Sequence, residues 1–368
     1  MGCPVPNSEE RHRGPEPARF LARSPTSIFT GTVTFEPALL KAGQATRSPP
    51  SPQLIHLTPS LVEQFAQAAA PAVVRTEVPL APFTTFKVGG PADVFVSAAS
   101  PEQLCAAVEA ARNLGIPYFL LGRGANILIG DGGFRGVVIR CEIGGINVSD
   151  DGLVKAGAGV DCYPDLIQAS VGAGLGGLHH FVGIPSTVGG AVWQNLHFLS
   201  PAPERERTVF FEEVMVSATI LSGQAVETVP ASYFNFGYDY STLHDTDDIV
   251  LDVTLQLTPT PIPELRQVIK ENLEWRDERH PDLWLYPCAG SIFKKIEGVG
   301  AGRLIDQCGL KGHVHGAAQI FHKHANIIVN LGGATAAEIC TLIDLARNTV
   351  ARELGYELEP EIGLIGEF

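Results

Sequence analysis

The sequence lacks the patterns that mark several common classes of protein. Its seven cysteines form no CxxC pair, so neither a zinc site nor a disulfide scaffold is expected. No HExxH or HxxxH spacing occurs either, and we predict no metal site. No apolar run approaches the roughly 20 residues that a bilayer-spanning helix needs, and the N-terminus has no apolar signal-peptide core. These absences predict a cytoplasmic protein without membrane partners.

Basic residues are also scarce. Lysine and arginine number 26 against 40 aspartates and glutamates, which gives a formal net charge of -14 at pH 7. The field of such a chain repels phosphate, so we expect no nucleic-acid partner, and an anionic substrate needs a local basic pocket. The chain is 368 residues long, 45% hydrophobic and 18% charged. This composition is typical of a folded protein with two or three domains.

The residues that are present divide the chain into three parts. Residues 1–55 are rich in proline, serine and arginine and show no helix or strand period, so we expect a flexible or disordered extension; a start codon placed too far upstream explains them equally well. Residues 56–258 alternate helix and strand signals. Three prolines, Pro259, Pro261 and Pro263, mark a boundary before residues 259–368. The mixture of signals predicts an α+β fold.

Local patterns predict the main elements. Hairpins should turn at Asp151-Gly152 and Ser222-Gly223. One predicted helix should turn Leu265, Val268, Ile269 and Leu273 inward. Apolar periodicity and turn residues predict helices over 57–70, 101–115, 263–281 and 334–355, strands over 117–122, 136–141 and 247–257, and an extended segment over 357–366.

Two glycine-rich blocks are candidates for binding a cofactor. The first, GRGANILIGDGGFRG at 122–136, lets backbone amides approach a pyrophosphate closely, although it is neither GxGxxG nor a P-loop. In the second, GIPSTVGGA at 183–191, a flat ring could lie beside the glycines and hydrogen-bond Thr187. Ordinary tight turns explain each block separately. The candidate residues are Gly122, Arg123, Gly124, Ala125, Asn126, Ile127, Gly183, Ile184, Pro185, Ser186, Thr187, Gly189 and Gly190.

A third block, YPCAGSIFKK at 286–295, is a candidate for catalysis. The hydroxyl of Ser291 can offer a proton while the Lys294 ammonium stabilises negative charge. A serine in this setting is also a common turn residue. A fourth block, AGRLIDQCGLKG followed by HANIIVN, supplies Arg303, Lys311, His322 and His324, and single residues of these types are usually solvated or structural.

Taken in order, these blocks resemble the UDP-N-acetylenolpyruvoylglucosamine reductases, or UDP-N-acetylmuramate dehydrogenases, of peptidoglycan synthesis. The similarity runs from Pro82 to Gly366, and its eight stretches are collinear. The stretches are TTFKVGGPAD at 84–93, GRGANILI at 122–129, GIPSTVGGA at 183–191, FGY at 236–238, AGSIFK at 289–294, AGRLID with GLKG at 301–312, HANIIVN at 324–330 and LEPEIGLIG at 358–366.

The resemblance implies an FAD-dependent oxidoreductase. It implies an FAD-binding region of two α+β subdomains, of the vanillyl-alcohol oxidase type, over 56–258, and a substrate-binding α+β domain over 259–368. Family enzymes pass hydride from NADPH through flavin N5 to an enolpyruvyl ether, and a serine donates the proton with help from a glutamate and an arginine. Ser291 and Glu361 match the serine and the glutamate. GRGANILI has no histidine or cysteine for covalent attachment, so we expect non-covalent FAD.

The arginine position departs from the family pattern. The family reads FGYRDS where this chain reads FGYDYS, which puts Asp239 in place of the arginine and changes the charge by two units. We expect Tyr238, Asp239, Lys294 and Arg303 to bind the substrate. Another cation could replace the arginine, and the candidates are Lys294, Arg303, Lys323 and Arg279.

Further departures lie nearby and leave two enzyme hypotheses open. Ser186 replaces the second glycine of the family's GIPG. Asn195 is followed by LHFLSP where the family has NAGAYG. Before HANIIVN, the run IFHKH stands where the family commonly has a serine. The first hypothesis is reduction of the enolpyruvyl ether of a UDP-sugar. The second is a paralogue of specialised metabolism that reduces or oxidises a different nucleoside or sugar-like compound. A flavoprotein without turnover is a third, less favoured possibility.

Overall fold

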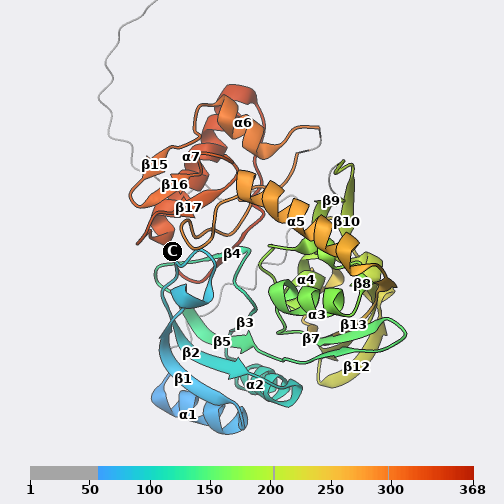
Figure 1. The fold of residues 1–368 in the computed structure, drawn as a ribbon. Helices are drawn as coiled ribbons and strands as arrows, with labels where there is room; N and C mark the ends of the chain where they lie inside the picture. Colours follow the sequence, from blue (N-terminus) through green and yellow to red (C-terminus); the bar gives the residue numbers. More distant parts are fainter. Residues whose placement is uncertain (1–56, 202–203, 297) are drawn as a thin grey trace, which may run out of the picture. The chain divides into compact units, whose positions relative to one another are not determined.

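The computed structural model describes residues 57–201, 204–296 and 298–368 (Figure 1). The expected extension over 1–55 lies outside these residues. Within the described part of the chain, no helix is long and apolar enough to cross a membrane. The architecture mixes helices with several separate sheets, which agrees with the predicted α+β fold.

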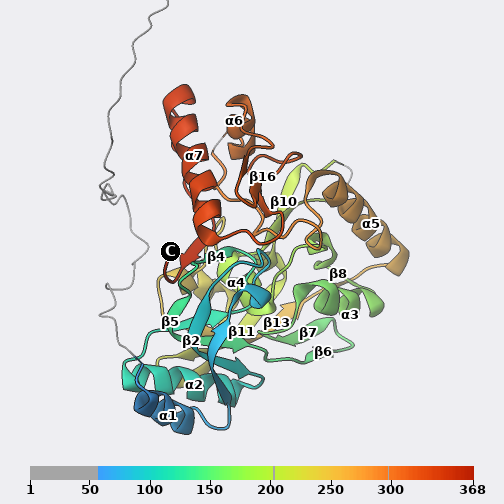
Figure 2. The same ribbon diagram turned by 90° about the vertical axis from the view of Figure 1, so that its left-hand side faces the viewer.

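The first part of the fold is a four-stranded sheet. Its order is β1-β2-β5-β3; β1 is antiparallel to β2, whereas β2, β5 and β3 are parallel. Helices α1 and α2 contact each other, and α2 packs on β2 and β5 (Figures 1 and 2). The elements are α1 (Pro59–Ala68), β1 (Val73–Pro79), β2 (Pro91–Ala98), α2 (Pro101–Leu114), β3 (Tyr118–Leu121) and β5 (Phe134–Cys141).

The second part is a five-stranded antiparallel sheet of order β12-β11-β13-β7-β6. Helix α4 packs against β13 and β7. Both predicted hairpins are confirmed, because Gly152 and Gly223 adopt the left-handed conformation at the turns between β6 and β7 and between β11 and β12. The elements are β6 (Ile146–Val148), β7 (Leu153–Gly157), α4 (Val188–Gln194), β11 (Met215–Ser222), β12 (Ala225–Pro230) and β13 (Ile249–Gln256).

Shorter elements connect these sheets. The strands are β8 (Leu175–Gly176), β9 (His197–Ser200), β10 (Arg207–Phe210) and β14 (Thr258–Pro259), with β9 paired to β10 and β8 to β14. The helices are η1 (Ala81–Phe83), η2 (Cys162–Leu166), α3 (Ile167–Gly172), η3 (His179–Phe181), η4 (Phe211–Val214), η5 (Ala231–Phe234) and η6 (Thr242–His244).

The C-terminal part is built on a small antiparallel sheet, β15-β16-β17, against which α7 packs, with α6 beside α7 (Figure 2). The chain then returns, and β18 pairs in parallel with β4 of the first glycine block. The elements are β4 (Ile127–Ile129), α6 (Ala301–Gln307), β15 (Val314–His315), β16 (Ala318–Ile320), β17 (Ile328–Asn330), α7 (Ala336–Leu354) and β18 (Gly363–Ile365).

Helix α5 (Ile262–Arg279) joins the second part to the C-terminal part (Figure 1). Leu265 is fully buried in the core of the two N-terminal sheets, but Val268, Ile269 and Leu273 are only half-buried. The second fully buried residue is Asn272, whose Nδ2 donates to the His180 carbonyl and to Ser200 Oγ. The helix therefore packs on the preceding sheets, and the exact domain boundary stays a prediction.

Residues of the 84–93 stretch and of the first glycine block also enter the C-terminal core. Phe86, Val88 and Leu128 belong to the same buried cluster as Ile292 and Phe293. The carboxylate of Asp131 accepts from the amides of Ala336 and Ala337 at the start of α7, at 2.8 and 3.0 Å, where a negative charge stabilises a helix. These contacts fix the C-terminal part against the loop in which the first block lies.

Candidate functional site

The segment that carries Ser291 is fixed by Asn326. Ile292 donates its backbone N–H to the Asn326 carbonyl, and the Asn326 side chain both accepts from the Phe293 amide at 3.0 Å and donates to the Phe293 carbonyl at 2.8 Å. Ser291 itself pairs with Ile327 across a β-bridge. The half-buried serine is therefore held on ordered backbone, as a group that transfers a proton must be.

Glu361 lies next to this segment. Its amide donates to the Ile292 carbonyl at 2.8 Å, and its own carbonyl accepts from Asn126 Nδ2 at 3.4 Å. Asn126 belongs to the first glycine block, and its carbonyl accepts from the Gly363 amide at 2.9 Å. The predicted catalytic residues are thus brought together, and the first candidate cofactor block is brought to them.

The electrostatics of Glu361 favour its protonated form. Burial is the largest cause, the Asp239 carboxylate adds to it, and Lys294 opposes both; together they raise the pKa of Glu361 from its ordinary 4.5 to about 8. At neutral pH Glu361 is therefore a neutral carboxyl that can donate a hydrogen bond.

We expect this proton to make stability depend on pH. The folded protein binds it more tightly than the unfolded chain does, so the contribution is complete below about pH 4.5 and is lost as the pH rises through about 8. The melting temperature should therefore fall less steeply between pH 5 and 8 in Glu361→Gln than in the wild type. Parallel curves for the two proteins would contradict the assignment of the titrating group.

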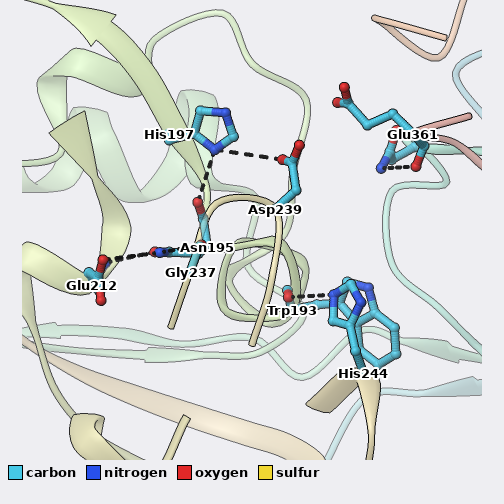
Figure 3. Close-up of polar contacts among 9 residues, drawn as sticks. Trp193, Asn195, His197, Glu212, Gly237, Asp239, His244 and Glu361 are labelled. Carbon is cyan, nitrogen blue, oxygen red and sulfur yellow. Dashed lines mark hydrogen bonds and ion pairs between the residues drawn. The ribbon is translucent and has the colours of Figure 1, made fainter. Parts of the chain in front are cut away.

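Asp239 lies on a tight turn opposite Glu361. The Gly237 amide donates to the Tyr240 carbonyl at 3.0 Å, and Asp239 has a φ of 52°, which aspartate tolerates better than most residues. Its side chain is only 7% exposed. Figure 3 shows the carboxylates of Asp239 and Glu361 extending toward the same space from different segments.

His197 is a neighbour of Asp239 that sequence reasoning missed. Its Nδ1 lies 3.8 Å from Asp239 Oδ1 and 3.2 Å from the Asn195 carbonyl (Figure 3). His197 is part of LHFLSP, one of the sequence departures, as Asp239 is part of another. The two departures face each other, and a hydrogen bond from Asn195 to the Gly237 carbonyl joins their segments across 42 residues of sequence. No local pattern could have indicated this pairing.

The four candidate cations differ in their position relative to the predicted catalytic residues. Lys294 acts on the pKa of Glu361 and binds Glu359, so it lies beside the predicted catalytic residues. Arg303 is exposed at the start of α6, Arg279 pairs with Glu278, and Lys323 donates to the Asp277 carbonyl.

Tyr238 is half-exposed, and burial of its hydroxyl, with the Asp239 and Glu361 charges, raises its pKa to about 12. Lys294 and Tyr238 therefore fit a substrate role better than Arg303.

The two glycine blocks meet at one pocket. A cavity of about 440 Å³ is lined by Gly122 and Arg123 of the first block, by Thr187 of the second, and by Gly144, Gly145 and Gly159 between the sheets. Arg123 forms an ion pair with Asp161 at 3.1 Å. Gly124 has a φ of 60°, and a Cβ there would lie 2.6 Å from the Phe83 carbonyl oxygen. Glycine is required for this close approach.

The second block also forms a helix start. The Thr187 hydroxyl accepts from the Gly190 amide at 3.2 Å and caps α4, which is the ordinary turn that the sequence equally allowed. His179 is buried and accepts from the Gly177 amide, whereas His180 is half-buried and hydrogen-bonded to Ser200 Oγ; burial lowers the pKa of each to about 4. This confirms their interpretation as structural residues.

A half-buried arginine beside the second block, Arg276, was not predicted. A Cβ at Gly183 would lie 3.0 Å from Arg276 Nε, so the side chain of this α5 residue covers the glycine. Burial lowers the pKa of Arg276 to about 10, which still leaves it charged at neutral pH. A desolvated cation at this place suits an anionic or polarised part of a cofactor.

Contact between the blocks gives a prediction for Gly122. A Cβ at this position would lie 2.8 Å from Thr187 Oγ1, the atom that caps α4. We expect Gly122→Ala to weaken FAD binding by about 10-fold, because crowding a packed contact costs roughly 1–3 kcal/mol. Gly172→Ala is the matched control, since a Cβ at Gly172 meets nothing within 4 Å. Equal FAD affinities, measured by fluorescence titration, would refute the prediction.

Comparison with known proteins agrees with this geometry. Residues 92–200 match the FAD binding domain model, and residues 281–365 match the model of the UDP-N-acetylenolpyruvoylglucosamine reductase C-terminal domain. The chain is 40% identical to the UDP-N-acetylenolpyruvoylglucosamine reductase of Moorella thermoacetica over 295 residues, which cover 80% of this chain and 94% of that protein. It is 38% identical to the Rubrobacter xylanophilus enzyme of the same name over 297 residues, 80% of this chain and 95% of that one.

A solved structure agrees as well. The fold is similar to that of UDP-N-acetylenolpyruvylglucosamine reductase from Thermus caldophilus, with a TM-score of 0.65 and 32% identity, over 80% of this chain and 98% of that chain. The two N-terminal sheets are thus an FAD-binding fold of the vanillyl-alcohol oxidase type, and the protein is an FAD-dependent oxidoreductase. On these similarities, which span nearly the whole length of the relatives, the chain belongs to the UDP-N-acetylenolpyruvoylglucosamine reductase family.

Proposed function

We propose that this protein reduces UDP-N-acetylenolpyruvoylglucosamine with electrons from NADPH in the cytoplasm, using non-covalent FAD. The observation that carries the proposal is the direct hydrogen bonding between the segments of Ser291 and Glu361 and their connection, through Asn126, to the first glycine block. Free thiols at all six cysteines in the described residues support a reducing compartment.

The residues around the pocket fit FAD. Gly122 of the first block and the glycines Gly144, Gly145 and Gly159 line the pocket without side chains. Near the second block, the half-buried Arg276 offers a positive charge beside Gly183. Bound FAD supplies the two-electron transfer between NADPH and the substrate. Residues 56–258 would hold it, and residues 259–368 would bind the UDP-sugar.

Ser291 is the proposed proton donor. Reduction of the enolpyruvyl double bond leaves negative charge on the carbon next to the carboxylate, and this carbon must receive a proton. Hydrogen bonds to Asn326 order the backbone beside Ser291, which supports its role as a donor that delivers the proton to one carbon.

Glu361 is proposed to act as a neutral hydrogen-bond donor. Its raised pKa keeps the carboxyl protonated at neutral pH. A neutral acid can donate to a substrate carboxylate on which charge accumulates, whereas a carboxylate would repel it. Lys294, which lies on the same side, adds positive charge.

The proposed function is tested by an anaerobic reaction. NADPH should bleach the flavin absorbance of the purified protein, and UDP-N-acetylenolpyruvoylglucosamine should restore it within seconds. If the substrate leaves the bleached flavin unchanged, the proposed substrate is wrong.

Asp239 favours a second candidate, a flavoenzyme that acts on a different nucleoside or sugar-like compound. A buried carboxylate in the predicted substrate site disfavours an anionic group beside it. Restoration of the absorbance by an analogue that keeps the double bond but has an uncharged amide in place of the carboxylate, and not by the enolpyruvyl compound itself, would support this alternative.

A further inference from the structure

Asp239 carries a buried oxygen without a partner. One oxygen, Oδ1, lies 3.8 Å from His197 Nδ1, while Oδ2 is buried and accepts no hydrogen bond from any described residue. The side chain is 93% buried, as its 7% exposure shows. A buried carboxylate oxygen is destabilising until a donor reaches it. In a predicted substrate site, the missing donor is most simply a ligand.

The surroundings fix the direction of this carboxylate. Asn195 Nδ2 donates to the Gly237 carbonyl at 3.0 Å, and Asn195 Oδ1 accepts from the Glu212 amide at 3.2 Å, which ties the turn to the start of η4. The His197 ring packs on the Tyr238 ring at 4.5 Å. The turn that carries Asp239 is therefore held by contacts on two sides.

The charges near Asp239 limit what can bind. Glu361 of the C-terminal part and His244 each lie near both Asp239 and Lys294. The Lys294 ammonium is bound to Glu359, and Glu212 lies behind Asn195. A second carboxylate would be repelled here. A neutral hydroxyl or an amide N–H satisfies the oxygen without repulsion.

We propose that Asp239 determines specificity by accepting, through Oδ2, a hydrogen bond from a hydroxyl or amide N–H of the substrate, and that His197 is a positioning residue that orients it. The proposal rests on the proposed function, because it adds a contact to the same substrate. An N-acetylated sugar nucleotide offers both kinds of donor. Its carboxylate would then lie on the side of Glu361 and Lys294.

Calorimetric titration of the FAD-loaded protein tests this contact. The probes are UDP-N-acetylmuramate and UDP-N-acetylglucosamine. We expect Asp239→Asn to weaken binding of at least one probe by about 10-fold or more, since a charged acceptor is lost, and Asp239→Arg to weaken it further. If a substrate carboxylate instead lay against residue 239, both substitutions would tighten binding of UDP-N-acetylmuramate, and the proposal would be overturned.

A double-mutant cycle tests the role of His197. His197→Gln should weaken binding several-fold when Asp239 is present and should have little further effect in Asp239→Asn. Independent, additive effects would reduce His197 to a packing residue and contradict its positioning role. His315→Gln, at an exposed position on β15, is the matched control, and FAD content and melting temperature report folding.

The possible failures can be told apart. Wild-type protein that binds neither probe contradicts the proposed function and this inference together. Wild-type protein that binds a probe with an affinity unchanged in Asp239→Asn contradicts this inference alone.

Discussion

Replacing Ser291 by alanine is expected to leave FAD bound and to slow substrate reduction by about 100-fold or more. The hydroxyl is lost, but Ile292 and Phe293 keep their hydrogen bonds to Asn326, because these involve backbone groups of the segment. Bleaching of the flavin by NADPH and its restoration by substrate are measured separately by anaerobic stopped-flow absorbance. Only the second rate should fall.

Ser232→Ala is the control for this prediction. Ser232 is exposed in η5, and its replacement should change neither rate. A Ser291→Ala protein that turns over at the wild-type rate would remove the serine from the mechanism. Loss of FAD from this variant would show that Ser291 has a structural role instead.

Glu361 should show the second large effect, and two substitutions separate its possible roles. Glu361→Ala removes the hydrogen-bond donor and should reduce kcat by about 100-fold to 1,000-fold. Glu361→Gln keeps a donor of similar shape and should retain activity within about 10-fold of wild type. Wild-type activity should fall as the pH rises through about 8, where Glu361 loses its proton. The glutamine variant should lack this fall.

A role for Glu361 as a carboxylate base predicts the reverse. Activity would then rise through about pH 8, and glutamine would be as damaging as alanine. Glu357→Gln, at an exposed position nearby, is the control and should keep the wild-type pH profile. The two profiles differ in sign, so one pH series distinguishes the two roles.

Local sequence patterns predicted much of the fold. In α2, Leu104, Val108 and Ala111 are fully buried as their spacing indicated, and Gly115 ends the helix in the left-handed conformation. Helix α5 was also predicted, but the burial of Asn272 and the partial exposure of Val268, Ile269 and Leu273 were not. Asn272 is buried there because His180 and Ser200 accept its hydrogen bonds, and partners 92 and 72 residues away leave no trace in a helical period.

The candidate site likewise contains residues that the sequence predicted and residues that only the structure showed. Resemblance predicted Ser291, Glu361 and the glycine blocks as separate stretches, and the structure brings Asn126 to Glu361 across 235 residues. His197 and Arg276 were not predicted, because each acquires its place only through contact with a distant segment. Asp239 was recognised as a departure from the family pattern, whereas its unpartnered oxygen became visible only in three dimensions.

A crystal structure of the FAD-bound protein would show whether Ser291 and Glu361 belong to one redox site. We expect the isoalloxazine ring to lie beside Asn126, within contact distance of the side chains of both Ser291 and Glu361. A ring bound elsewhere, with those two side chains far from it, would exclude both residues from the reaction.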